Sequence, residues 1–141
     1  DLKQAMLDAA RPHCLRILGP NCIGLALPHI GLNATFSHIA SPKGDLALLS
    51  QSGALITGFL DWASSRAIGF TQVVSLGDMA DVDFGDLLDY LAGDSKSRAI
   101  LMYMEAVTHD MRPAHLLRAP TPVRLPGSMR LTTLRFGVQV S

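Results

Sequence analysis

Apolar and polar positions alternate along this chain in blocks that predict strands and helices in turn. A continuous apolar run at residues 46–49 is typical of a strand buried on both faces, and residues 70–76 and 98–104 predict two further strands. Between them, apolar residues recur at helical spacing over residues 53–66 and 84–92. Because strand–helix–strand units cross over in the right-handed sense, we predict an α/β fold with a doubly wound parallel sheet and helices on both faces.

The first forty residues follow a less regular pattern. Residues 2–11 predict a short amphipathic helix, and residues 14–18 predict a short strand. Residues 19–24 (GPNCIG) predict a turn, and further short strands are expected near residues 24–27 and 33–36.

Single residues indicate how the two later helices begin and pack. Asp83 is a candidate N-cap for the 84–92 helix, and Gly93 is expected to end that helix. Phe59 and Trp62 lie one turn apart in the 53–66 helix, a spacing that predicts two core residues.

Composition and charge narrow the class of protein. The 141 residues are 48% hydrophobic, which is enough for the core of one domain. The 12 basic and 12 acidic residues balance, so we expect neither a nucleic acid nor a membrane surface as partner. Cys14 and Cys22 without a signal peptide favour a reducing, cytoplasmic setting, and no apolar run approaches the roughly 20 residues that span a bilayer.

The C-terminal residues 108–141 differ from the rest of the chain in charge and proline content. Residues 1–107 carry 7 basic and 11 acidic groups, whereas residues 108–141 carry 5 arginines and one aspartate. The four prolines after residue 112 disfavour helices and central strands. We predict that residues 109–141 form an irregular, Arg/Pro-rich tail that is disordered or read from a shifted frame. The start at Asp1 likewise suggests a fragment.

The sequence Ser50-Gln51-Ser52-Gly53 follows a predicted strand and opens a predicted helix. A helix N-terminus offers unpaired N–H groups and the positive end of a dipole, so this segment is a candidate phosphate cradle. It is not a P-loop, because the Gly-Lys-Ser/Thr sequence is absent. Ordinary helix capping by serine and glycine is the alternative interpretation.

Two further strands end in residues that suit a site. Gly77 and Asp78 follow the 70–76 strand, and Glu105 follows the 98–104 strand. In open α/β sheets, ligands bind beyond the carboxyl ends of the strands. The convergence of hydroxyls, glycines and carboxylates at one edge favours a functional role for residues 50–53.

A metal site and a reactive thiol are weaker interpretations. Aspartates at 78, 81, 83, 86 and 89 could supply oxygen ligands, but capping and solvent exposure account for them more simply, so we predict no metal site. Cys22 has no neighbour in sequence that would lower the pKa of a thiol, and a packing or site-lining role is preferred.

Four motifs together carry a resemblance to a known family. They are the GPNCIG turn at residues 19–24, SQSGAL at 50–55, SLGD at 75–78 with Asp83-Phe84, and Met104-Glu105-Ala106. In this order and spacing they resemble the succinyl-CoA synthetase α-subunit-like ligase domain of NDP-forming acyl-CoA synthetases. That group includes ADP-forming acetate–CoA ligases, and protein lysine acetyltransferases carry a related module. The resemblance implies a flavodoxin-like fold.

The resemblance implies a reaction and a role for each motif. Acid, coenzyme A and ATP would give acyl-CoA, ADP and phosphate through an acyl phosphate and a phosphohistidine. The phosphate-binding residues would be Ser50, Gln51, Ser52 and Gly53, whose helix dipole suits a dianion. Glu105 would be the catalytic residue that orients the histidine. The turn beside coenzyme A would be Pro20, Asn21 and Cys22.

The chain departs from the family in its histidines. The family's phosphohistidine precedes a small residue and glycine, and none of His13, His29, His38, His109 and His115 has that context. We therefore expect the nucleophile to be absent and the chain alone to be inactive. ATP, ADP and Mg²⁺ would bind through an ATP-grasp domain or subunit that this chain lacks.

These observations predict three segments and leave two functions open. Residues 1–19 would end a preceding CoA-binding domain, residues 20–108 would form the ligase-like domain, and the tail would follow. The chain would then be part of an acyl-CoA synthetase that acts on small-molecule substrates. We also expect it to self-associate through the faces on which neighbouring domains would dock. The alternative is a non-catalytic CoA- or ligand-sensing module of a protein lysine acetyltransferase.

Overall fold

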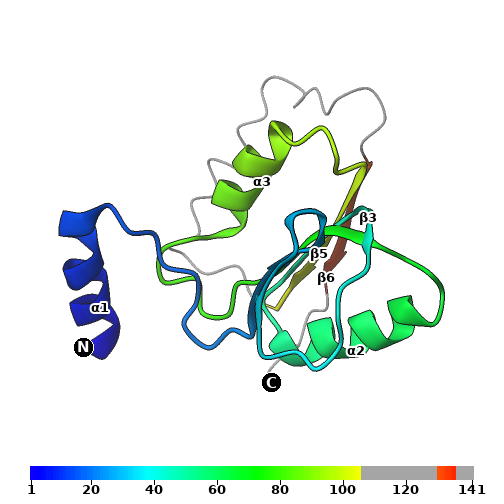
Figure 1. Ribbon diagram of the computed structural model, residues 1–141. Helices are drawn as coiled ribbons and strands as arrows, with labels where there is room; N and C mark the ends of the chain where they lie inside the picture. The colour runs from blue at the N-terminus through cyan, green and yellow to red at the C-terminus, as the bar shows by residue number, and fades with distance from the viewer. Residues whose placement is uncertain (106–129, 136–141) are drawn as a thin grey trace.

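The computed structural model describes residues 1–105 and 130–135 (Figure 1). Its strands are β1 (Gly24–Leu27), β2 (Leu32–Thr35), β3 (Lys43–Ser50), β4 (Phe70–Ser75), β5 (Ala99–Met104) and β6 (Arg130–Arg135). Its α-helices over the same residues are α1 (Leu2–Ala10), α2 (Gly53–Ser64) and α3 (Phe84–Ala92), with 3-10 turns at Arg11–His13 and Pro28–Ile30. The described strands form one six-stranded sheet in the order β2-β1-β4-β3-β5-β6.

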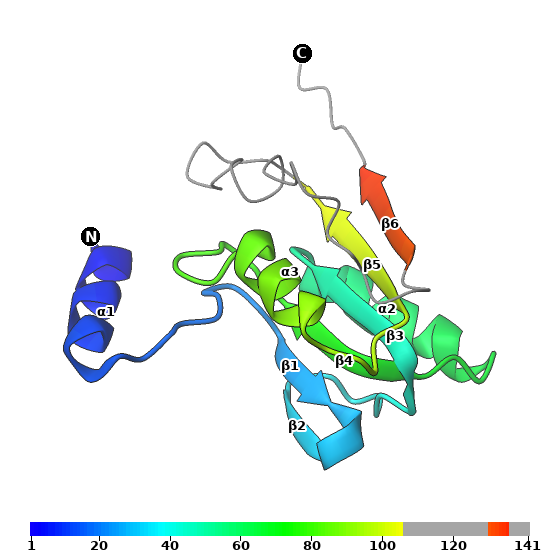
Figure 2. The same cartoon turned by 90° about the horizontal axis from the view of Figure 1, so that it is seen from above.

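The centre of the sheet is parallel and doubly wound, as the sequence predicts. Strand β3 lies between β4 and β5 and runs parallel to both. Helices α2 and α3 cover opposite faces of the sheet (Figures 1 and 2). The register aligns Ser50 with Ser75 on one side and with Tyr103 on the other, so the three strands end at nearly the same level.

The sheet is not parallel throughout. Strand β1 is antiparallel to both β2 and β4, with Leu25 opposite Val74. No crossover helix precedes β1, because the chain turns over residues 19–23 and enters the sheet from the edge at which β4 ends. The outer hairpin of β1 and β2 therefore adds a mixed margin to the parallel centre.

Two clusters of buried side chains hold the helices on the sheet. Phe84 and Leu91 anchor α3 in one cluster, and Ile56 and Leu60 anchor α2 in the other. Full burial of one such side chain contributes about 1.5–3 kcal/mol, so the apolar face of each helix fixes its position. The remaining buried members are Ala63 of α2 and residues in the strands or at their ends, which are Ala47, Leu49, Val74, Leu76, Ile100, Met102 and Met104 under α3, and Ala26, Leu48, Phe70 and Val73 under α2.

The predicted strand at residues 14–18 is wrong. The chain forms a 3-10 turn up to His13, passes through Cys14 in the left-handed region (φ 54°), and continues without sheet pairing. Its backbone bonds instead to the loop before α3, where Val82 donates to the carbonyl of Ile17 at 3.1 Å. The apolar residues there line the side of a loop, and α1 stands apart from the sheet (Figures 1 and 2).

The tail prediction is tested only in part. Within it, Arg130–Arg135 form β6, which pairs in parallel with β5, so an irregular conformation does not hold for these six residues. The rest of the predicted tail, residues 109–129 and 136–141, lies outside the described residues.

Candidate functional site

The sequence motifs meet at the carboxyl edge of the parallel strands. Residues 50–53 follow β3, Gly77 and Asp78 follow β4, and Glu105 follows β5. The turn at residues 19–23 reaches the same edge because β1 runs antiparallel to β4. Segments from four parts of the chain therefore form one surface.

Ser50 shapes the turn between β3 and α2 from inside. Its side chain is fully buried, its Oγ donates to the carbonyl of Ser52 at 2.9 Å, and it accepts from the Ser52 N–H at 3.0 Å. With both bonds made inside the turn, this hydroxyl is not presented to a ligand. Ser50 therefore fixes the conformation of the turn, and a direct contact from its hydroxyl to phosphate stays an untested prediction.

Ser52 is the N-cap of α2. Its Oγ accepts from the N–H of Leu55 at 3.3 Å, and its carbonyl accepts from Ile56 at 3.3 Å. The first amides of the helix, those of Gly53 and Ala54, have no acceptor within the helix by its geometry. Among the described residues, no hydrogen bond to either amide is found. The capping interpretation is therefore correct for Ser52 and leaves two amides directed outward at the positive end of the dipole.

Gly53 allows the turn at residues 19–23 to pack against the start of α2. A Cβ at this position would lie 2.5 Å from Cγ2 of Ile23. The N–H of Ile23 also donates to Oγ of the buried Ser75 at 3.2 Å. Glycine is thus required here by close packing, and its contact joins the turn to the candidate cradle.

Gln51 links the ends of β3 and β5. Its backbone N–H donates to the carbonyl of Tyr103 at 3.1 Å, and its side-chain Oε1 accepts from the N–H of Glu105 at 2.7 Å. The carboxylate of Glu105 is exposed at the edge. The structure therefore brings Glu105 beside the residues that open α2.

The turn with Pro20, Asn21 and Cys22 is fixed by the loop after β4. Asp78 donates its N–H to the carbonyl of Pro20 at 2.9 Å, and its carboxylate accepts from Nδ2 of Asn21 at 3.1 Å. The Gly19–Pro20 peptide is cis, and Asn21 has a φ of 55°. Cys22 is half-buried, with its Sγ 3.6 Å from the carbonyl of Leu18. Asn21 is left exposed at the edge, paired to Asp78.

Gly77 permits this docking. Its φ is 55°, and a Cβ would lie 2.2 Å from the carbonyl oxygen of Pro20 and 2.4 Å from that of Asn21. A side chain at residue 77 would therefore displace the turn and adopt a backbone conformation that favours glycine.

An ion-pair network that the sequence did not predict joins Arg16, just before the turn at residues 19–23, to Asp81 and Asp86. Arg16 Nε lies 3.0 Å from Asp81, and one of its terminal nitrogens lies 2.9 Å from Asp86. Asp81 also accepts from the N–H of Ile17 at 2.7 Å. The available signal was a charged residue, Arg16, within the predicted strand at residues 14–18; its side chain is 57% exposed, so burial did not require a partner.

The two charges shift each other's pKa values. The hydrogen bond to Asp81 raises the pKa of Arg16, and Asp86 adds to the effect. Partial burial alone would raise the pKa of Asp81, but the hydrogen bonds from Ile17 and Arg16 outweigh it and lower that pKa below its usual value. Asp83 caps α3 in a reciprocal pair with Asp86, so these aspartates have structural partners.

Among the described histidines, His29 lies at the opposite end of β3 from the candidate site. Nε2 of His29 lies 2.8 Å from the carbonyl of Gly44, near the start of β3 and therefore at the opposite end of the strand from Ser50. His13 and His38 are exposed. The other two histidines of the sequence, His109 and His115, lie outside the described residues.

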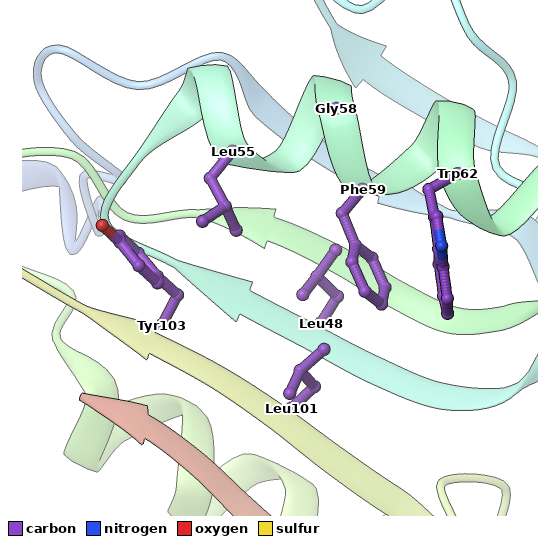
Figure 3. A pocket seen from close by; sticks show the side chains of 7 residues that line it. All are labelled: Leu48, Leu55, Gly58, Phe59, Trp62, Leu101 and Tyr103. Carbon is purple, nitrogen blue, oxygen red and sulfur yellow. The ribbon is translucent and has the colours of Figure 1, made fainter. Parts of the chain in front are cut away.

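An apolar groove of about 450 Å³ runs along α2 and begins at Tyr103, beside the polar edge (Figure 3). Leu55, Phe59 and Trp62 face Leu48 and Leu101 across it, with Tyr103 at one end. Trp62 is 45% exposed, so the prediction that it lies in the core is wrong, while Phe59 is half-buried. The guanidinium of Arg66 lies 4.5 Å from the Trp62 ring, which places the indole at a solvated margin.

This chain is similar in sequence to known proteins. Residues 43–123 match the family described as the succinyl-CoA ligase like flavodoxin domain. The ADP-forming acetate–CoA ligase I of Archaeoglobus fulgidus is 44% identical over 106 residues, covering 75% of this chain and 16% of that protein. The α subunit of ADP-forming acetate–CoA ligase II of Pyrococcus furiosus is 41% identical over 110 residues, covering 78% and 24%.

Solved structures agree in fold. The dinucleotide-forming acetyl-coenzyme A synthetase 1 of Ca. Korarchaeum cryptofilum, in complex with phosphate and ADP, superposes with a TM-score of 0.83 at 29% identity. The match covers 95% of this chain and 28% of that one. A crystal structure from Pyrococcus horikoshii OT3 gives a TM-score of 0.83 at 35% identity, covering 96% and 30%.

The extent of these matches bears on the predicted fragment and on the predicted domain boundary. The chain spans about a sixth to a quarter of the length of these curated relatives. The family match extends to residue 123, beyond the predicted domain boundary at 108.

Within the described residues, no helix is long and apolar enough to cross a membrane.

Proposed function

This chain belongs to the succinyl-CoA ligase like flavodoxin domain family, and from that premise we propose that it supplies the phosphate cradle of an NDP-forming acyl-CoA synthetase. The reaction is acid, coenzyme A and ATP to acyl-CoA, ADP and phosphate. The observation that carries the proposal is the convergence of α2's first amides, Ser52 and Glu105 at one sheet edge. The named relatives are ADP-forming acetate–CoA ligases.

The cradle works through fixed dipoles. The amides of Gly53 and Ala54 would donate to phosphoryl oxygens, and the N-terminal end of α2 favours a dianion by about 0.3–1 kcal/mol. Ser52 holds the first turn of the helix through Leu55, so these donors need no reorganisation when the anion arrives. Ser50 acts behind them by fixing the turn.

Glu105 completes the chemistry in this proposal. An exposed carboxylate beside the cradle would accept the N–H of an imidazole, which makes the opposite ring nitrogen a better nucleophile toward phosphorus. That imidazole would be provided from outside the described residues. The carboxylate of Glu105 repels a free phosphate. It favours binding only when the phosphoryl group is carried on a histidine.

The remaining assignments follow the same frame. The turn of Pro20, Asn21 and Cys22 would lie beside the thiol end of coenzyme A, since it contacts the cradle through Ile23 and Gly53. ATP, ADP and Mg²⁺ would be held by an ATP-grasp domain or subunit. That some relatives are α subunits supports a subunit partner. Residues 1–19 would then connect to a CoA-binding domain.

Titration of the ¹⁵N-labelled chain with inorganic phosphate tests the cradle. The amide signals of Gly53 and Ala54 should shift, and Ser52→Ala should weaken binding several-fold. Ser65→Ala removes a hydroxyl at the other end of α2, where Oγ bonds the carbonyl of Trp62, and should leave binding unchanged. Shifts that avoid the start of α2, or equal affinity in the Ser52 variant, would show that the cradle is misassigned.

A binding test also addresses the alternative. We expect the chain alone to form no acyl-CoA from acetate, coenzyme A, ATP and Mg²⁺. A chain that binds coenzyme A but no phosphate would instead favour the sensing module of a lysine acetyltransferase.

A further inference from the structure

The side chain of Gln51 replaces a missing backbone bond between β3 and β5. In a parallel pair, the N–H and C=O of one residue bond to the two residues that flank its partner. Ser50 is aligned with Tyr103, so Gln51 is opposite Met104. Its N–H bonds to Tyr103 as the ladder requires, at 3.1 Å. The second ladder bond would join Glu105 to the backbone carbonyl of Gln51, but Glu105 donates to the side-chain Oε1 at 2.7 Å.

Because the side chain of Gln51 accepts this hydrogen bond, the backbone of the same residue can turn away from the sheet. The backbone leaves the sheet after Ser50 to form the cap turn at Ser52, while β5 remains tied through Glu105. Without the side-chain acceptor, the first residue beyond β5 would lose its bond to β3 just where β3 ends. One carboxamide therefore holds the start of α2 and the backbone of Glu105 together.

We infer that Gln51 is a positioning residue for Glu105 rather than a ligand to the phosphoryl group. The importance of Glu105 rests on the proposed function, but the contact itself does not. The side-chain oxygen of Gln51 is committed to the Glu105 N–H, whereas its NH2 group is a donor, so an equal loss of phosphate affinity in Gln51→Met is the result that would assign the residue to the phosphoryl group instead. As a positioning residue, Gln51 affects the site through the place it gives to a neighbouring carboxylate.

The chemistry of the contact selects two informative variants. Gln51→Met keeps the length and shape of the side chain and removes the acceptor. Gln51→Glu keeps an acceptor oxygen and adds a negative charge beside Glu105. The first variant should release the Glu105 backbone, and the second should retain it while repelling anions. Gln4→Met, on exposed α1, is the matched control.

Hydrogen exchange of the Glu105 amide tests the contact directly. Exchange should accelerate by at least about tenfold in Gln51→Met, because the amide loses its acceptor, and should stay near wild type in Gln51→Glu and Gln4→Met. Unchanged exchange in Gln51→Met would overturn the inference.

Two anionic probes test the consequence for the site. N-phosphoimidazole carries the ring that Glu105 would hold, whereas inorganic phosphate does not. In Gln51→Met, affinity for N-phosphoimidazole should fall about five- to tenfold, and affinity for phosphate should stay within about twofold. Gln51→Glu should weaken both probes, with a loss that shrinks at high salt. Equal losses for both probes in Gln51→Met would make Gln51 a phosphate ligand and overturn the inference.

The two proposals fail in different ways. If wild-type protein binds neither probe, the proposed function is wrong, and amide exchange at Glu105 still decides whether Gln51 fixes that residue. If both probes bind and exchange in Gln51→Met is unchanged, the function stands and the role of Gln51 falls.

Discussion

The carboxylate of Asp81 lies 2.7 Å from the backbone nitrogen of Ile17, 64 residues earlier in the chain. The same carboxylate pairs with Arg16, and these contacts hold the unpaired segment before the turn against the loop after β4. The edge that carries the candidate site is therefore supported by a charged contact behind it as well as by the sheet.

Asp81→Asn should reduce stability in a pH-dependent way. Because the folded state lowers the pKa of Asp81, its contribution is complete above the unfolded pKa, near 3.9, and is lost as pH falls through the folded value. We expect a loss of about 1–2 kcal/mol at pH 7 in urea unfolding and a smaller difference from wild type at pH 3. A difference that is constant between the two pH values would contradict the assignment.

Gly53→Ala and Gly58→Ala should have opposite effects although both lie in α2. A methyl at residue 53 meets Ile23 at 2.5 Å and should destabilise by about 1–3 kcal/mol. At residue 58 a methyl meets nothing within 4 Å, and the helix should gain about 0.5–1 kcal/mol. Urea unfolding of both variants checks the pair, and destabilisation by both would show that the turn does not pack on α2 as described.

Gly77→Ala and Gly31→Ala separate steric conflict from backbone strain. Both glycines have positive φ, 55° and 72°, but only residue 77 has backbone atoms within 4 Å of an added Cβ. Gly31→Ala should cost about 1 kcal/mol from strain alone, and Gly77→Ala should cost at least about 2 kcal/mol. In ¹⁵N spectra, the amides of Asn21 and Asp78 should move only in the Gly77 variant. Equal costs would argue against close docking of the turn.

Asp83→Ala should weaken α3 by removing its cap. Asp83 accepts from the Asp86 N–H at 3.0 Å, and Asp86 returns a bond to the Asp83 N–H at 3.1 Å. The expected cost is about 1–2 kcal/mol by thermal unfolding. Asp83→Asn keeps an acceptor oxygen and should lose well under half of that. Equal losses in both variants would show that charge, and not capping, matters at this position.

The strands and helices of the centre were predictable because their burial is local in sequence. The apolar run at residues 46–49 faces helices on both sides, and the capping role of Asp83 follows from its spacing alone. Convergence of residues 50–53 with Glu105 also followed, because parallel neighbours end at one edge.

The differences arise where a residue's partner is distant in sequence. The segment at residues 14–18 resembles a strand until Asp81 is known to bond Ile17. Nothing near Gln51 in sequence indicates its reach to Glu105. The enclosure of the Ser50 hydroxyl by Ser52 is local, but it depends on a turn geometry that the residue types do not specify. Trp62 lies on the same side of α2 as Leu55 and Phe59, but it lines an open groove and stays 45% exposed.

The antiparallel pairing of β1 affects the order in which the molecule can assemble. Paired residues of β3 and β4, such as Leu48 and Val73, are separated in sequence by little more than one helix. Leu25 of β1 pairs with Val74 of β4, nearly fifty residues further along the chain. Closing the longer loop costs more entropy, so the β3–α2–β4 unit has the shorter route to its native contacts. The turn with Pro20 and Asn21 docks on β4 and the loop that follows it. This side of the site therefore forms after the β3–α2–β4 unit. Substitutions in that turn should accelerate unfolding more than they slow folding.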